Sequence, residues 1–138
     1  MSSNLKVIDV KTSARTQLVD ITDRVKRAVS ESGVREGTCY IFVPHTTAAV
    51  TINENADPSV GADILKEVNK IVPFEDGYSH VEGNSAAHIK SSLIGQSLFV
   101  FVAEGRPVLG TWQGIYFCEF DGPRQRKVLV KVVSDQAL

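Results

Sequence analysis

The sequence predicts an α+β fold, with one domain over residues 1–138, a mostly antiparallel twisted sheet and about three helices. Short runs rich in β-branched and aromatic residues recur along the chain and indicate strands. Three other segments space their apolar residues as amphipathic helices do. The helices interrupt the strands irregularly, without the steady strand and helix alternation of a parallel sheet, so an antiparallel sheet is favoured.

The first helix is predicted at residues 20–32. Asp20 is a candidate N-cap and Gly33 follows the end, as the conformational preferences of these residues favour. The predicted buried face consists of Ile21, Val25, Ala28 and Val29.

The second helix is predicted to begin at Asp57-Pro58, a capping residue followed by proline at the first helical position, and to stop before Pro73. Its apolar stripe consists of Val60, Ile64, Val68, Ile71 and Val72.

The third helix is predicted from Ser85 to Ile94. On a helical projection one face is apolar and another is polar, so His88 is expected to point away from the apolar face. The apolar face consists of Ala86, Ile89 and Leu93, and the polar stripe of Ser85, His88 and Ser92.

Seven strands are predicted: Leu5 to Val10, Gln17 to Ile21, Thr38 to Val43, Ala49 to Asn53, Leu98 to Val102, Gly114 to Phe120 and Lys127 to Val133. The last run, KVLVKVV, is nearly continuous in apolar residues. Such a pattern is typical of a strand covered on both faces, so we expect it at the centre of the sheet or against another subunit.

Composition narrows the class of partner. The net charge of -1 and the pI near 6.3 lack the basic excess of proteins that bind nucleic acids or membrane surfaces, so a small molecule or a protein is expected instead. The chain lacks a long apolar run and a signal-peptide pattern, which predicts a cytoplasmic protein. Cys39 and Cys118 lie in apolar strand runs and are interpreted as reduced core thiols rather than as a disulfide or a reactive pair.

The three histidines, His45, His80 and His88, all have polar neighbours in the sequence. No two have the spacing of a helical zinc pair, so a metal site would have to be assembled by the fold from separate segments. A hydrogen-bonded structural role is the alternative for each.

Two acids follow the predicted strand that ends near Asn53. Asp57 precedes a proline and a helical stripe, which is typical of an N-cap. Glu54 lies between two asparagines and has no comparable local role, so it is the better candidate for a metal, proton or substrate contact.

A second polar cluster, EFDGPRQR at residues 119–126, contains two acids, a Gly-Pro turn and two arginines. In strand geometry Arg124 and Arg126 point to the same face, where their guanidinium groups could hold a phosphate or carboxylate. The alternative is salt bridging to Glu119 and Asp121, and both interpretations can hold together.

The glycine-spaced stretch at residues 105–114 contains the only tryptophan. Trp112 could stack on a flat ring, with packing in a core or a subunit interface as the alternative. A Walker-type phosphate loop is excluded, because the sequence has no Gly-Lys-Ser or Gly-Lys-Thr.

Three segments together resemble the YjbQ-like family, also described as secondary thiamine-phosphate synthases: HTTAAVTINENADPSV, HVEGNSAAHIKSSLIGQSL and GRPVLGTWQGIYFCEFDGPRQRKVLV. They cover most of residues 45–133, and GTWQGI preceded by SSLIGQS is the family's own signature. The resemblance implies a compact α+β subunit, a homotrimer and weak thiamine-phosphate synthase activity.

The resemblance also implies a set of site residues. Glu54, His45 and Arg124 would be catalytic. His45, His88 and His80 would hold a divalent metal ion, zinc or magnesium. Substrate contacts would come from Arg124, Arg126, Trp112, Gln113, Asn84 and Glu119.

In that reaction a pyrimidinylmethyl diphosphate joins a thiazole phosphate and releases pyrophosphate, so cations would stabilise the leaving group. The alternative is a trimeric module that binds a metal or a phosphorylated metabolite without turnover. A third interpretation gives His45 and His88 only a structural role at a subunit interface.

Overall fold

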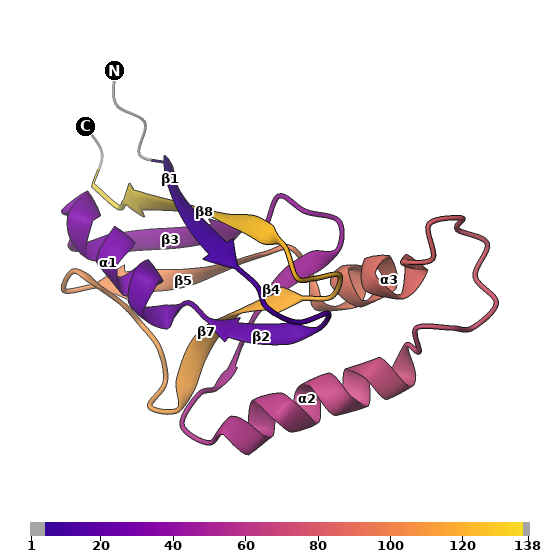
Figure 1. Ribbon diagram of the computed structural model, residues 1–138. Coiled ribbons are helices and arrows are strands. Elements are labelled where there is room, and N and C mark those ends of the chain that lie inside the picture. Colours follow the sequence, from indigo (N-terminus) through magenta and orange to yellow (C-terminus); the bar gives the residue numbers. More distant parts are fainter. Residues whose placement is uncertain (1–4, 137–138) are drawn as a thin grey trace.

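Two antiparallel sheets form the frame of the protein, which the computed structural model describes over residues 5–136 (Figure 1). The larger sheet has the order β1-β8-β3-β5-β6 and the smaller has the order β2-β7-β4. The strands are β1 (Leu5–Lys11), β2 (Gln17–Asp20), β3 (Gly37–Phe42), β4 (Ala48–Glu54), β5 (Ser97–Ala103), β6 (Arg106–Pro107), β7 (Gln113–Glu119) and β8 (Gln125–Ser134). All the pairings between them are antiparallel among the described residues.

Three helices, α1 (Thr22–Ser32), α2 (Pro58–Ile71) and α3 (Ser85–Ile94), complete the fold. α1 packs between the sheets with its predicted apolar face buried, and the main core lies there. α2 and α3 lie on the other side of the small sheet, over a second and smaller apolar cluster. Asp57 caps α2 as predicted, because its carboxylate accepts a hydrogen bond from the backbone N–H of Ser59 at 2.9 Å.

The predicted fold class is confirmed, and the seven predicted strands all form within two residues of their expected bounds. The two-residue strand β6 was not expected. The first helix begins two residues later than predicted, with Ile21 at the N-cap position, although the Asp20 carboxylate still accepts the N–H of Thr22 at 2.9 Å. Cys39 and Cys118 are free and buried, which confirms them as core thiols, and burial raises their pKa to about 11 and about 12.

The prediction for β8 is half right. The strand lies between β1 and β3, inside the sheet, as expected. Its side chains nevertheless alternate: Val128, Val130 and Val132 are buried in the core, whereas Lys131 and Val133 are exposed. One face of the large sheet is therefore uncovered within the chain.

The apolar face predicted for α3 is only partly buried. Ala86 is buried, but Ile89 and Leu93 are exposed, and the rest of the side turned inward is made of Ala87, Ser91 and Lys90. Lys90 is fully buried, its Nζ donates to Asn69 Oδ1 at 2.7 Å and lies 3.9 Å from the centre of the Phe74 ring. Burial, with the charge of Arg15, lowers the pKa of Lys90 to about 8.

Three connecting segments converge at one end of the sheets: residues 12–16 between β1 and β2, residues 43–47 between β3 and β4, and residues 120–124 between β7 and β8. Backbone hydrogen bonds join them, from Thr12 N–H to Arg124 O at 2.9 Å and from Phe120 N–H to Thr47 O at 3.2 Å. The first turn of α3 lies beside them (Figure 1). This convergence places the polar residues that the sequence singled out.

Among the described residues, none of the helices combines the length and the apolar character needed to span a bilayer.

Candidate functional site

A cavity of about 920 Å³ opens where these segments converge. We call it the histidine–arginine cavity. It is lined by Phe42, Val43, Pro44, His45, Thr46, Thr47, His80, Glu82, Asn84, His88, Ser92, Gln96, Asp121, Arg124 and Arg126. The fold thus brings together the three histidines, Arg124, Arg126 and Asn84 from three separate stretches of the chain.

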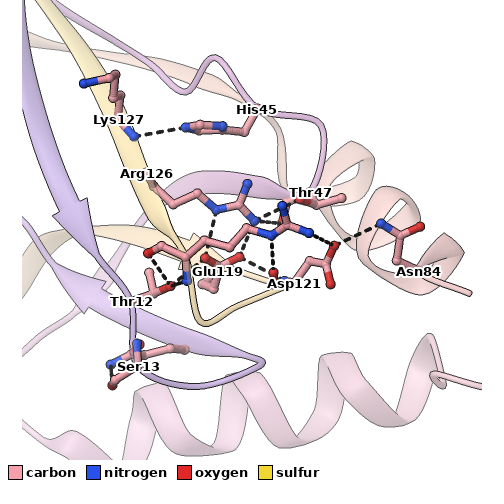
Figure 2. A network of polar contacts seen from close by, with 11 residues as sticks. Thr12, Ser13, His45, Thr47, Asn84, Glu119, Asp121, Arg126 and Lys127 are labelled. Atoms are coloured by element: carbon pink, nitrogen blue, oxygen red, sulfur yellow. Dashed lines mark hydrogen bonds and ion pairs between the residues drawn. The ribbon is translucent and has the colours of Figure 1, made fainter. Parts of the chain in front are cut away.

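Arg126 and Glu119 form a buried ion pair beneath the cavity (Figure 2). Arg126 Nε donates to Glu119 Oε1 at 2.8 Å, and Arg126 Nη2 donates to Glu119 Oε2 and to Thr47 Oγ1. The Arg126 side chain is 5% exposed and that of Glu119 is 0% exposed. The guanidinium group is therefore held in one orientation by partners on two different segments, Glu119 at the end of β7 and Thr47 before β4.

The Glu119 carboxylate has further donors. Thr12 Oγ1 donates to Oε1 at 2.7 Å, and the backbone N–H of Asp121 donates to Oε2 at 2.9 Å. Burial alone would raise the pKa of Glu119, but the hydrogen bonds from Arg126, Asp121 and Thr12 outweigh it and hold the pKa below its ordinary value. Glu119, predicted to contact substrate, is fully buried and lies beneath the cavity lining.

Gly122 allows the turn after β7 to reach this position. A Cβ at this residue would lie 2.3 Å from the carbonyl oxygen of Ala14 and 2.8 Å from Glu119 Cγ, so only glycine fits between them. The following Pro123 is joined by a cis peptide bond. The turn then delivers Arg124 to the cavity wall.

Arg124 is fixed by Asp121. Its Nε donates to the backbone oxygen of Asp121 at 2.8 Å and its Nη2 to Asp121 Oδ2 at 3.1 Å. The same Oδ2 accepts a hydrogen bond from Asn84 Nδ2 at 2.9 Å, which ties the start of α3 to the turn (Figure 2). Asn84 Oδ1 is buried and has no hydrogen-bond partner among the described residues.

The salt-bridging alternative is confirmed for both arginines, because each pairs with one acid of the same segment. Both also line one cavity, and the binding of a phosphate or carboxylate there stays a prediction. Of the described residues, none accepts a hydrogen bond from Nη1 of Arg124 or Arg126, so both of these nitrogens can donate to a ligand.

His45 is held in its neutral form. Its Nε2 accepts a hydrogen bond from the backbone N–H of Lys127 at 3.0 Å (Figure 2). A backbone N–H can only donate, so Nε2 carries no proton and the ring proton is on Nδ1. Partial burial and the charge of Arg126 lower the pKa of His45, in agreement with this tautomer. To bind a metal ion through Nε2, His45 would have to lose this hydrogen bond.

His80 and His88 form a second part of the cavity wall. Their ring centres are 5.4 Å apart, with the rings edge to face. No group of three or more His, Cys, Asp or Glu side chains among residues 5–136 has an arrangement that could hold a metal ion. The described part of the chain thus supplies no closed set of ligands by itself, and the metal site stays a prediction.

Glu54, Trp112 and Gln113 lie away from the histidine–arginine cavity. Glu54 pairs with Gln113 at the far end of β4, roughly 20 Å of strand from the end that follows Thr47. Gln113 Oε1 accepts the N–H of Gly110 at 2.7 Å, and Trp112 is 64% exposed. Within one chain these residues lie too far from His45 to share a site with it, because they are at one end of the paired strands β4 and β7 and His45 is near the other end.

The comparisons with known proteins agree with this fold. Residues 6–135 match the family described as UPF0047 protein YjbQ-like. The chain belongs to this family. A UPF0047 protein of Methanocaldococcus jannaschii is 54% identical over 127 residues, 92% of each chain, and the UPF0047 protein YugU of Bacillus subtilis is 50% identical over 131 residues, 94% of this chain and 99% of that one.

Solved structures of family members are equally similar. An uncharacterised conserved protein of the YjbQ/UPF0047 family from Clostridium acetobutylicum is 56% identical, with a TM-score of 0.91 over 93% of this chain and 99% of that one. A protein of unknown function from Sulfolobus solfataricus is 36% identical, with a TM-score of 0.91 over 95% of this chain and 96% of that one. These similarities show the fold, whereas the names of the relatives give no activity.

Two residues of the site were missed by sequence reasoning. Thr12 and Thr47 are buried hydroxyl residues that complete the network around Arg126. Asp121, which orients Arg124, was predicted as a salt-bridge partner, because it lies three residues before Arg124 in the acidic and basic cluster. Nothing in the sequence around Thr12 indicates that it meets Glu119, which is 107 positions away.

Removing Arg126 should destabilise the protein strongly. In Arg126→Met the Glu119 carboxylate stays buried without its cation, and the free energy of unfolding should fall by about 3–5 kcal/mol. Urea unfolding measures this change. The double variant Arg126→Met with Glu119→Leu should recover part of the loss. As a control, Lys127→Ala breaks an exposed ion pair with Asp9 and should cost less than about 1 kcal/mol. Equal losses in the two single variants would contradict the buried-pair interpretation.

His45 should make stability depend on pH. Its folded pKa lies below its unfolded value, so its contribution is complete above that unfolded value, about 6.5, and is lost as the pH falls through the folded pKa. His45→Gln keeps an acceptor for Lys127 but does not titrate. Between about pH 7.5 and about pH 5, the stability of the variant relative to wild type should improve, by at most about 1.4 kcal/mol per pH unit. Parallel stability curves in urea unfolding would contradict this.

Proposed function

We propose that the histidine–arginine cavity binds the phosphate group of a small metabolite through Arg124 and Arg126. The observation that supports this most directly is the pair of guanidinium groups on one cavity wall, each with Nη1 left over. Guanidinium groups match the oxygen spacing of phosphate and stay charged at all physiological pH values. Because Glu119 and Asp121 already fix both side chains, little further side-chain entropy is lost when a ligand binds.

The same carboxylates also limit the affinity. Each arginine charge is largely balanced by its acid, so the cavity attracts a phosphate by directed hydrogen bonds more than by net charge. His45 adds a neutral Nδ1–H donor on the same side. His80, His88, Phe42 and Pro44 also line the cavity, and their rings give a surface for a flat ring.

We further propose, from the family resemblance, that the ligands are the thiamine-phosphate precursors and that turnover is weak. The ring nitrogen of the thiazole phosphate would form a bond to the pyrimidine methylene carbon as the bond from that carbon to diphosphate breaks. The electron pair leaves with pyrophosphate, and Arg124 and Arg126 would stabilise the charge that develops there. A bound zinc or magnesium ion would add Lewis-acid stabilisation, but one subunit offers too few ligands, and no step of this proposal depends on it.

Binding without turnover is the second candidate function. It is favoured by the state of the two arginines, since both are already paired with a carboxylate and so contribute less to a departing diphosphate. Glu54, Trp112 and Gln113, the other predicted participants, are at the far end of β4. In this alternative the cavity stores or senses a phosphorylated metabolite.

We also propose that the chain forms a homo-oligomer, a trimer by the family resemblance, in the cytoplasm. The uncovered face of the large sheet supports the first part, because it carries exposed aromatic side chains on neighbouring strands: Tyr40, Phe42, Phe99 and Phe101. Large exposed apolar patches are typical of interfaces. Phe42 also lines the histidine–arginine cavity, so this sheet face and the cavity are adjacent.

Arg124→Ala should weaken phosphate binding. The loss of a charge-assisted hydrogen bond predicts a dissociation constant at least about tenfold higher for pyrophosphate, measured by calorimetry on the full chain. Lys131→Ala, at an exposed cation of β8 outside the cavity, is the matched control and should bind as wild type does. Unchanged binding in Arg124→Ala would overturn the phosphate site.

The same three proteins then separate the two candidate functions, by pyrophosphate release from the two thiamine precursors. Release by wild type and by Lys131→Ala, but not by Arg124→Ala, would support catalysis. Intact phosphate binding with no release by wild type would leave the binding function and exclude the synthase.

Phe101→Asp should dissociate the proposed oligomer, since a carboxylate would be buried against apolar side chains of another copy. Sedimentation velocity should show trimers for wild type and monomers for the variant. Ile71→Asp, at a similarly exposed apolar residue on α2, is the control and should stay trimeric. A monomeric wild type would overturn the oligomer.

A further inference from the structure

A second, smaller cavity lies between α2 and the outer face of the sheet β2-β7-β4. We call it the α2 cleft, and its volume is about 180 Å³. Leu18, Cys118 and Phe120 line it from the strands and the turn after β7, and Leu65 and Val68 line it from α2. In Figure 1 α2 runs along this side of the small sheet and is joined to the rest of the chain by a loop at each end.

The cleft is unlike the rest of the interior in its packing. α1 buries four residues in the main core, whereas no residue of α2 is buried, although α2 is longer. Protein interiors normally leave few voids larger than a water molecule, and apolar voids are not stabilised by water. The side chains of the protein therefore leave the space under α2 unfilled.

The chemistry of the lining is apolar and uncharged. None of the residues that line the cleft is acidic, basic or histidine. Burial keeps the Cys118 thiol protonated, so this residue adds no charge. This contrasts with the histidine–arginine cavity, where both arginines and all three histidines gather. A charged ligand would lose its hydration in the cleft without gaining a partner.

One edge of the α2 cleft is polar. Thr51 and Asn53, two residues apart on β4, both line it. Asn53 Oδ1 accepts a hydrogen bond from the backbone N–H of Glu54 at 2.7 Å. The amide Nδ2 of Asn53 is therefore left as a donor for a ligand. Among the described residues, none makes a side-chain hydrogen bond with the Thr51 hydroxyl, so one hydroxyl and one amide N–H can receive a polar substituent of a ligand.

We propose that the α2 cleft binds a neutral molecule of about one ring that carries a single hydroxyl or similar polar group. The ring would lie between α2 and the strands, with Phe120 and the Cys118 sulfur against its faces or edge. Its polar group would face Thr51. The volume fits this class, because an apolar cavity of about 150 Å³ in another protein admits benzene. This site is independent of the phosphate-binding proposal.

Phenol, benzene and benzoate are suitable probes on the full chain, followed by methyl NMR. We expect saturable shifts for phenol and benzene at the methyl groups of Leu65, Val68 and Ile94, and none there for benzoate. Thr51→Val, which replaces the hydroxyl by a methyl group of similar size, should weaken phenol binding by about 2- to 10-fold and leave benzene binding unchanged. Equal loss or no loss for both probes would overturn the role of Thr51.

A filling variant tests the place of binding. Leu65→Trp should abolish the shifts for both probes, whereas Lys66→Trp, on the exposed side of the same helix, should preserve them. Binding by Leu65→Trp as by wild type, or shifts confined to other surfaces, would overturn the cleft as the site. Absence of saturable shifts in wild type would do the same. Should Leu65→Trp fail to fold, Thr51→Val still decides.

Discussion

The buried pair of Arg126 and Glu119 is the interaction on which the site depends. It joins β8 to the end of β7, and through Thr12 and Thr47 it reaches the segments after β1 and before β4. These segments belong to both sheets, so one guanidinium group holds together the convergence that forms the cavity. An apolar replacement could fill the volume, but it would offer nothing to the four oxygen atoms that now surround the arginine.

This arrangement gives Arg126 two tasks. Its Nε and Nη2 are committed to the fold, and only Nη1 is left for a ligand. Arg124 forms a similar ion pair, with Asp121 in place of Glu119, but its side chain is 55% exposed. The two arginines should therefore behave differently when removed: the loss of Arg126 acts first on stability, and the loss of Arg124 acts first on binding. For this reason Arg124 is the informative position for testing function.

Much of the fold followed from local patterns, and the parts that did not have physical causes. Strand alternation and the Asp57-Pro58 cap depend on neighbouring residues, so they could be read from the chain. The pairing of Arg124 and Arg126 with acids of the same segment was foreseen because the partners are close in sequence. The contact of Thr12 with Glu119 was not, because it depends on how β1 lies beside β8. Glu54 and Trp112 were grouped with His45 because all three belong to the segments that resemble the family. The length of β4 keeps Glu54 and His45 apart in the structure.

The exposure of Ile89 and Leu93, on the predicted apolar face of α3, has a different cause. Apolar periodicity identifies residues that avoid water, but it does not say which molecule covers them. In α3 the inward face accepts a lysine, because Asn69 and Phe74 satisfy its ammonium group, while Ile89 and Leu93 stay exposed. The outer face of the large sheet shows the same exposure of apolar residues, and its strand β8 was predicted to be covered on both sides. Two independent patterns thus predict more burial than one subunit provides. This shortfall is what a second copy of the chain would remove, and it links the sequence pattern directly to the proposed assembly.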